Sequence, residues 1–271
     1  MKKLFYLMLL SFCMTFITSC KKNTDTPAPT NNNGTTNIST ELNKKWSTSA
    51  ATSRISTDAA ASDFASFEFN AAGNYYIIKA DKSLLSGTFT LNTADSIVTL
   101  FNGSSTTSQY GTLKINSISA TQFIFKLTLN ATVTPIAIST TAVTTSVGGS
   151  SSNSVNTTAK LAKAWKMDSL RQGSTTTAIP NTMYAHFVLT EGGTYWTETY
   201  NGPGTTVAIV SGQWKWSDNT NTKICGSSTD VAPDCSGDPS TISFTANGNL
   251  IMSNTPTGQA TKTYYFSILT Q

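Results

Sequence analysis

The chain alternates apolar and polar residues over short runs through most of its length. Apolar side chains recur at every second position in Phe67 and Phe69, Phe89 and Leu91, Leu113 and Ile115, and Phe123, Phe125 and Leu127. Turn-forming dipeptides such as Asn-Gly and Gly-Asn separate these runs. Because successive side chains of a strand point to opposite faces, a period of two predicts strands with one buried face. The pattern predicts an all-β protein of short antiparallel strands, folded as a sandwich or a closed barrel.

The pattern occurs twice along the chain. Leu, Lys and Trp stand at the same spacing in LNKKW (42–46) and LAKAW (161–165). Three further pairs follow in the same order: FEFNAAGNYY (67–76) with FVLTEGGTYW (187–196), SGTFTL (86–91) with SGQWKW (211–216), and FIFKLTL (123–129) with YYFSILT (264–270). Four blocks in one order predict a tandem duplication.

The region between the two copies divides into a strand and a linker. Residues 131–158 carry no charge, and 14 of these 28 residues are Ser or Thr. The part up to Val143 alternates apolar and small polar residues, which predicts a last strand of the first copy. The remainder, 144–157, has the Gly/Ser composition of a flexible linker.

Each copy opens with the LxKxW block, which differs from the alternating pattern. Thr40 or Thr158 is placed to cap a short helical turn there, and the Trp that follows is expected to pack under the strands. This block, the later F.F...G.Y and SG.F.L spacings, and their order resemble the lipocalin-like domains found singly or in tandem in bacterial exported lipoproteins.

The resemblance implies a fold and a role for two tryptophans. It implies two tandem small antiparallel lipocalin-like β-barrels, at 41–143 and 158–271, joined by a Ser/Thr-rich linker. In that family a short turn carrying Gly-x-Trp closes one end of the barrel. The resemblance therefore assigns a barrel-closing role to Trp46 and Trp165. Lys44 and Lys163 stand where the family has Gly.

The N-terminus has the features of an export signal. Lys2 and Lys3 precede an apolar run at 4–17, which is shorter than the roughly 20 residues that span a bilayer. ITSC (17–20) resembles the lipobox of bacterial lipoproteins, which implies a signal peptide at 1–19 and a lipidated Cys20; the alternative is an ordinary signal peptide with a coincidental Cys. Residues 20–40 have the composition of a flexible stem.

The anchor implies a location and a partner. Lys21 follows Cys20 where many inner-membrane lipoproteins have Asp, so the resemblance to that sorting rule favours the outer membrane, on its periplasmic face or at the cell surface. The membrane is then a partner through the lipid at Cys20. Without Lys2 and Lys3 the chain has 16 basic and 14 acidic residues, and it has no basic cluster beyond Lys21 and Lys22. We therefore expect no nucleic-acid partner.

Cys225 and Cys235 are predicted to form a disulfide. They are the cysteines left after Cys13 departs with the signal peptide and Cys20 is acylated, and the chain is bound for an oxidising compartment. The alternative of a zinc site has little support, because neither a second Cys pair nor a His lies near them in the sequence.

The sequence offers little for catalysis. His186 is the only His, next to an inward-facing Phe187, so a surface position is expected. The sequence contains no G-x-S-x-G, P-loop or H-E-x-x-H motif. Asp230, Asp234 and Asp238 carry the carboxylates that calcium uses, but without EF-hand spacing a solvated acidic loop is preferred. We expect no enzyme, no bound metal and no cofactor.

Aromatic residues of the second copy are the candidate ligand-binding residues. Trp214 and Trp216 share one strand face, and their counterparts Phe89 and Leu91 indicate that this face is core. Trp196 and Tyr200 precede a Gly/Pro turn, so they are expected to be the more exposed pair. These residues favour binding of a small apolar ligand or a glycan at a barrel rim. The alternative is a structural or accessory lipoprotein whose filled barrels present a surface to a protein partner.

Two serines are candidate modification sites. Asp95-Ser96-Ile97 and Asp168-Ser169-Leu170 resemble the Asp-Ser/Thr-hydrophobic pattern for O-glycosylation of exported proteins in some Gram-negative bacteria. The alternative is an unmodified serine in a turn, because Asp and Ser favour turns through side-chain to backbone hydrogen bonds.

Overall fold

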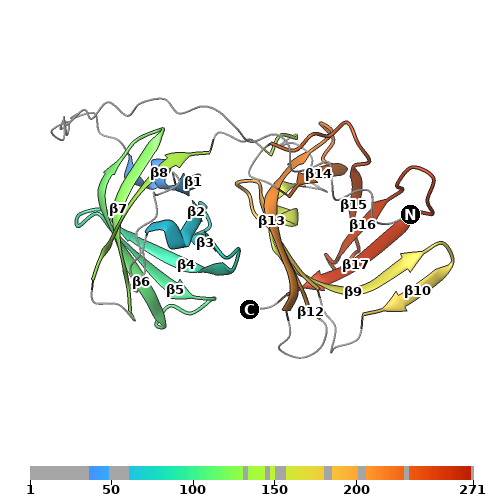
Figure 1. The fold of residues 1–271 in the computed structure, drawn as a ribbon, viewed down its shortest axis with the longest axis horizontal. Coiled ribbons are helices and arrows are strands. Elements are labelled where there is room, and N and C mark those ends of the chain that lie inside the picture. The colour runs from blue at the N-terminus through green and yellow to red at the C-terminus, as the bar shows by residue number, and fades with distance from the viewer. Residues whose placement is uncertain are drawn as a thin grey trace, which may run out of the picture. The chain divides into compact units, whose positions relative to one another are not determined.

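The computed structural model describes residues 37–48, 61–130, 134–143, 147–149, 157–179, 185–200, 206–228 and 232–269. The predicted signal peptide, Cys20 and most of the predicted stem lie outside these ranges. Two closed antiparallel β-barrels follow each other along the chain (Figure 1), which confirms the predicted fold class. None of the helices in the described ranges is long and apolar enough to span a membrane.

The first barrel is an up-and-down ring in which each strand pairs with the next along the chain. Its strands are β1 (Lys45–Thr48), β2 (Phe64–Phe69), β3 (Asn74–Lys79), β4 (Leu84–Asn92), β5 (Ile97–Asn102), β6 (Gln109–Ile118), β7 (Gln122–Leu129) and β8 (Ile136–Ala142). The strand predicted before Val143 is β8, and its pairing with β1 closes the ring, with Trp46 opposite Ala142. The 3-10 helix η1 (Ala61–Asp63) precedes β2.

The second barrel has the same order with one added strand. Its ring consists of β9 (Ala164–Gln172), β11 (Ala185–Leu189), β12 (Thr194–Tyr200), β13 (Thr206–Trp216), β14 (Lys223–Ser227), β15 (Ser240–Phe244), β16 (Leu250–Asn254) and β17 (Lys262–Ile268). Pairing of β17 with β9 closes it, with Ile268 opposite Trp165. The extra strand β10 (Thr175–Ala178) forms a hairpin with the far end of β9.

A short helix precedes each barrel: α1 (Ile38–Leu42) and α2 (Thr158–Leu161). The predicted capping residues, Thr40 and Thr158, were wrong, because each helix is capped by a residue earlier in the chain. The α1 N-cap is Asn37, whose side chain accepts from the Ser39 amide, and the α2 N-cap is Thr157, which accepts from the Lys160 amide. These residues have extended backbones and offer a side-chain oxygen to the free amides of the first turn, as an N-cap requires.

Strand order shows that one of the four repeat alignments was wrong. FIFKLTL lies in β7, the seventh strand of its ring, whereas YYFSILT overlaps β17, the eighth strand of the other. Registers place Leu250 and Met252 of β16 at the positions of Phe123 and Phe125, each opposite the corresponding residue of the last strand. The sequences align because both barrels carry alternating aromatic residues, but on neighbouring strands.

The other blocks match strand for strand. Tyr75 of β3 and Tyr195 of β12 each lie against a glycine of the following strand. A Cβ on Gly87 would meet the Tyr75 ring at 3.0 Å and the Phe101 carbonyl oxygen at 1.9 Å. A Cβ on Gly212 would meet the Tyr195 ring at 2.9 Å and the Ser227 carbonyl oxygen at 1.8 Å. Only glycine fits at these positions, which explains the shared SG in both copies.

The predicted linker is partly packed on the second barrel. Val147 joins the core cluster of that barrel, and its carbonyl oxygen accepts from the Trp216 amide at 2.7 Å. A Cβ on Gly149 would lie 2.7 Å from the Trp216 ring. Residues 147–149 therefore cover part of the core.

Candidate functional site

A cavity of about 360 Å³ opens into the interior of the second barrel. Inward-facing apolar side chains form its floor: Phe187, Leu189, Tyr195, Trp214, Ile224 and Met252. They come from five strands of the ring, β11, β12, β13, β14 and β16. Since alternate residues of a strand point inward, the barrel itself assembles this apolar surface.

The cavity follows from smaller residues at positions that are aromatic in the first barrel. There, the Phe69 ring packs against Phe89 at 5.2 Å, and Phe67 packs against Phe125 at 5.1 Å. The counterparts of Phe69 and Phe125 in the second barrel are Leu189 and Met252. A side chain smaller than Phe leaves space in an interior that is otherwise close-packed. Two aromatic positions of the first barrel thus hold smaller side chains in the second, and both of these line the cavity.

The described residues of the loop between β14 and β15 lie at the rim of the cavity. Cys225 of β14 and Cys235 of this loop form a disulfide, with 5.5 Å between their Cα atoms, which confirms the predicted bond. Both cysteines line the cavity, together with Gly237 and Pro239. The disulfide thus ties the rim to the barrel wall directly beside the opening.

Two carboxylates lie on this rim. Asp234 accepts from the amide and the hydroxyl of Ser236, both at 2.9 Å, and these bonds hold the pKa of its carboxyl below the ordinary value. Asp238 accepts from the Thr257 amide at 3.1 Å. Both side chains are exposed and line the cavity. Asp230, the third residue of the predicted acidic loop, lies outside the described residues.

No group of three or more His, Cys, Asp or Glu side chains is placed to hold a metal ion in the ranges that the structure describes. Asp234 instead stabilises its own loop, because its carboxylate accepts hydrogen bonds from Ser236, two residues later, and so closes a turn.

Of the four candidate ligand-binding residues, the structure brings one to the cavity. Trp214 is 2% exposed and lines the floor, and its Nε1 donates to the Thr190 carbonyl oxygen at 3.0 Å. Trp216 is also buried, 5.6 Å from Trp214 between ring centroids, and its Nε1 donates to the Thr158 hydroxyl at 3.0 Å. Both positions are core, as the comparison with the first copy indicated.

The expected exposure of Trp196 was wrong. Trp196 is 7% exposed, because residues of the first barrel cover it: it packs in one cluster with Ile78 and Val188, and its Nε1 donates to the Lys82 carbonyl oxygen at 2.8 Å. The period of two correctly predicted that Trp196 points away from the core of its own barrel. It carries no information about whether another part of the protein covers the outer face of that strand. Tyr200 is half-buried, with its ring 5.7 Å from that of His186.

Glu68 was missed by the sequence analysis. This carboxyl is 2% exposed and accepts hydrogen bonds from the second barrel, from the Thr190 hydroxyl and the Gly192 amide, each at 2.8 Å. Burial raises the pKa of Glu68 above its ordinary value, against the opposing effects of the Thr190 bond and the charge of buried Lys45. On β2 it alternates with Phe67 and Phe69 and therefore resembled an ordinary outward-facing polar residue.

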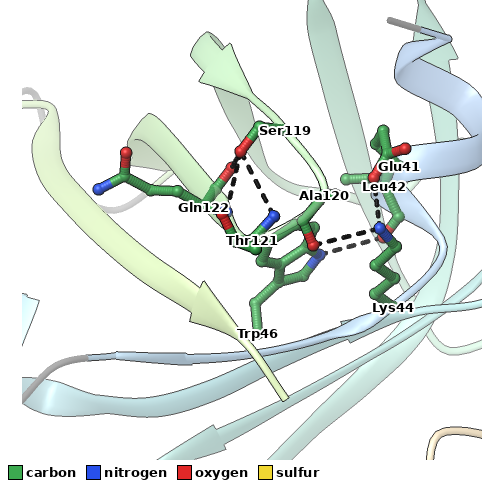
Figure 2. A network of polar contacts seen from close by, with 8 residues as sticks. All are labelled: Glu41, Leu42, Lys44, Trp46, Ser119, Ala120, Thr121 and Gln122. Carbon is green, nitrogen blue, oxygen red and sulfur yellow. Dashed lines mark hydrogen bonds and ion pairs between the residues drawn. The ribbon is translucent and has the colours of Figure 1, made fainter. Parts of the chain in front are cut away.

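The two LxKxW blocks form the same small structure. Trp46 is fully buried, and its Nε1 donates to the Leu42 carbonyl oxygen at 3.2 Å, as Figure 2 shows. Lys44 makes an ion pair with Glu41, and its ammonium lies 5.9 Å from the centre of the Trp46 ring. Lys44 is accommodated beside the buried Trp46 because its side chain is partly exposed.

The remaining candidate sites lie away from the cavity. Ser96 is at a turn with φ of 52°, before β5, whereas Ser169 is inside β9, opposite both Ala178 and Tyr265. His186 is partly buried, not fully on the surface, and burial lowers the pKa of its imidazole, with Glu198 opposing and Lys166 adding to the shift. Neither serine lines the cavity.

Comparisons with known proteins add little. No known protein-family model matches the chain, and no curated protein matches its sequence. Among solved structures, a tryptophan-to-alanine mutant of the vaccine antigen transferrin binding protein B from Haemophilus parasuis aligns with 74% of this chain and 52% of that chain, at 10% identity and a TM-score of 0.21. This chain thus spans about half the length of that protein, and a TM-score this low supports no conclusion about fold or function.

Proposed function

We propose that the protein is a lipid-anchored cell-envelope lipoprotein of the outer membrane, with two lipocalin-like barrels, and that its second barrel binds a small apolar ligand. The observation that carries the binding proposal is the cavity of about 360 Å³ in that barrel, whose floor is apolar and whose rim is polar. Ligand pockets are concave, mostly apolar and about 300–1,000 Å³ in volume, with a few polar groups that orient the ligand. The cavity floor and its acidic rim have this composition.

An apolar ligand is favoured over a glycan. A glycan site needs aromatic faces that a sugar can stack on, and the described candidates do not supply a group of them. Trp216 and Trp196 are buried by other parts of the protein, and Tyr200 lies beside His186 away from the cavity. Trp214 offers its ring only inside the barrel.

Binding without catalysis is part of the proposal. A carboxyl that acts as a general acid near neutral pH needs a raised pKa. Asp234 has the opposite shift, because the Ser236 hydrogen bonds stabilise its charged form. His186, the only imidazole in the chain, does not line the cavity.

The anchor is proposed from ITSC and tested at the mature N-terminus. Mass spectrometry of protein from the native host is expected to show acyl chains on Cys20. A free amine at any other N-terminal residue would exclude this anchor. The intact mass from the same sample also tests the predicted O-glycosylation, because sugar adds mass beyond the polypeptide and the lipid.

Binding is tested with the neutral fluorophore N-phenyl-1-naphthylamine, whose emission rises in an apolar cavity. We expect saturable binding to the full chain carrying Cys20→Ser, a change that keeps a protein acyl chain from competing. Met252→Phe is expected to abolish binding, because it places in the cavity the ring that Phe125 supplies in the first barrel. Phe125→Met is the matched control and should leave binding unchanged.

The alternative is an accessory role in which the barrels present a surface to a protein partner. It is favoured by the aromatic packing inside the first barrel, where Phe69 lies against Phe89 and Phe67 against Phe125. Absence of saturable probe binding, with Met252→Phe indistinguishable from the wild type, would favour this alternative.

A further inference from the structure

The lining of the cavity has an uneven charge. Among the lining residues that the structure describes, Asp234 and Asp238 are the only ionisable side chains apart from Tyr195, because the two cysteines are joined as a disulfide and none of the others is Lys, Arg or His. Both carboxylates are on the rim, and the floor below them is apolar and aromatic. A ligand in this cavity therefore meets apolar side chains at one end and negative charge at the other.

Both carboxylates are held in place and keep acceptor capacity. The Ser236 amide and hydroxyl each occupy one position on Asp234, and the Thr257 amide occupies one on Asp238. A carboxylate has about four acceptor positions, so each can accept further hydrogen bonds from a ligand. Asp234 stays ionised near neutral pH, because its hydrogen bonds lower its pKa.

One cation of the protein acts on this rim. Lys215 lies opposite Cys225 in the sheet, and its charge contributes to the lowered pKa of Asp234. Lys215 alternates with Trp214 and Trp216, which point inward, so its side chain leaves the barrel on the outer face. It does not line the cavity, and a ligand inside meets the carboxylates rather than this ammonium.

We propose that the ligand is a small organic cation, an alkyl or aryl amine whose apolar body enters the barrel while its ammonium group lies between Asp234 and Asp238. This inference rests on the proposed function and adds the charge of the ligand to it. Aromatic rings such as Trp214 and Tyr195 tolerate a nearby cation, because the face of a π system is negative. An anionic amphiphile would place its charge against two carboxylates.

The test compares three probes with the same hydrocarbon body: octylammonium, octanol and octanoate. Titration calorimetry is done at pH 7 and low ionic strength, with the full chain carrying Cys20→Ser. An exposed ion pair contributes about two- to fivefold in affinity. We therefore expect octylammonium to bind about two- to fivefold more tightly than octanol, octanoate to bind more weakly than both, and added salt to reduce the difference.

Variants assign the preference to the rim. Asp234→Asn with Asp238→Asn should bring octylammonium to the affinity of octanol and leave octanol unchanged. Asp81→Asn is the matched control, because Asp81 is also exposed and also accepts from the amide and hydroxyl of the serine two residues later. It should leave all three affinities unchanged.

The outcomes separate the two proposals. If none of the three probes binds at one site per chain, the proposed function fails and this inference fails with it. If octanol binds but octylammonium is no tighter, or if the preference survives the double change, the cation inference is overturned and the apolar binding site stands.

Discussion

The indole Nε1 of Trp165 donates a hydrogen bond to the carbonyl oxygen of Leu161, at 2.9 Å. Trp46 makes the same bond to Leu42 in the first barrel, at 3.2 Å. In each barrel the short helix ends at the Leu, which is fully buried, and the Trp four residues later fills the core beside it. The repeated LxKxW spacing is therefore the sequence of a core-building unit, used once for each barrel.

Trp165→Phe is expected to destabilise the second barrel by about 2–3 kcal/mol, from lost packing volume and the lost hydrogen bond. The Leu161 carbonyl keeps a second donor, the Lys163 amide at 2.8 Å, which limits the cost. Urea denaturation measures the loss. Trp46→Phe is the matched variant and should cost a similar amount in the first barrel, and unchanged transitions for both would show that the bond is not needed.

Gly212→Ala and Gly87→Ala are expected to prevent proper folding of their barrels. In each case the new methyl group meets a backbone carbonyl oxygen closer than 2 Å, at 1.8 and 1.9 Å, so strands must separate. Overpacking usually costs about 1–3 kcal/mol, and a clash with backbone is expected to exceed this. Gly237→Ala is the control, since nothing lies within 4 Å of its Cβ position. Soluble yield and circular dichroism measure whether each variant folds. Equal yields and equal spectra for all three variants would contradict the expectation.

Reduction of the Cys225–Cys235 bond is expected to lower the free energy of unfolding by about 2–3 kcal/mol, the size expected for a short closed loop. The double variant Cys225→Ser with Cys235→Ser should show the same loss without reductant and no further loss with it. Because both cysteines line the cavity, binding of the neutral probe should weaken in parallel. Wild-type stability that does not respond to reductant would contradict this role.

The buried Glu68 carboxyl predicts a pH dependence. Burial raises its pKa above the ordinary value, so at pH values between the ordinary pKa and the raised one the folded state binds more protons than the unfolded state. Stability of the wild type should then fall as pH rises through this interval, by at most about 1.4 kcal/mol per pH unit. Glu68→Gln does not titrate and should lack this decline in urea denaturation between pH 4 and 8.

Glu191→Gln is the control for this measurement. Glu191 is exposed on the turn that contains Gly192, and its removal should leave the wild-type pH dependence in place. A Glu68→Gln variant with the same decline as the wild type would show that other groups cause it.

The sequence by itself determined the architecture. Alternation of apolar and polar residues, the repeated blocks and the two cysteines predicted strands, two copies and the disulfide. These features are local or nearly so: a strand has a side-chain period of two, and a turn needs particular residues at adjacent positions. The same local rules put Trp214 and Trp216 in the core.

Only the tertiary structure decided which faces are covered and where space remains. Trp196 and Glu68 both point away from their own barrel cores, and the sequence gives no sign that residues of the other barrel bury them. The cavity likewise depends on Leu189 and Met252, which both line it although they are far apart in the sequence. Whether two such side chains leave a void depends on the packing of several strands at once. An interior is close-packed only when the side-chain volumes of all its strands together fill it, and the pattern of one strand does not fix that total.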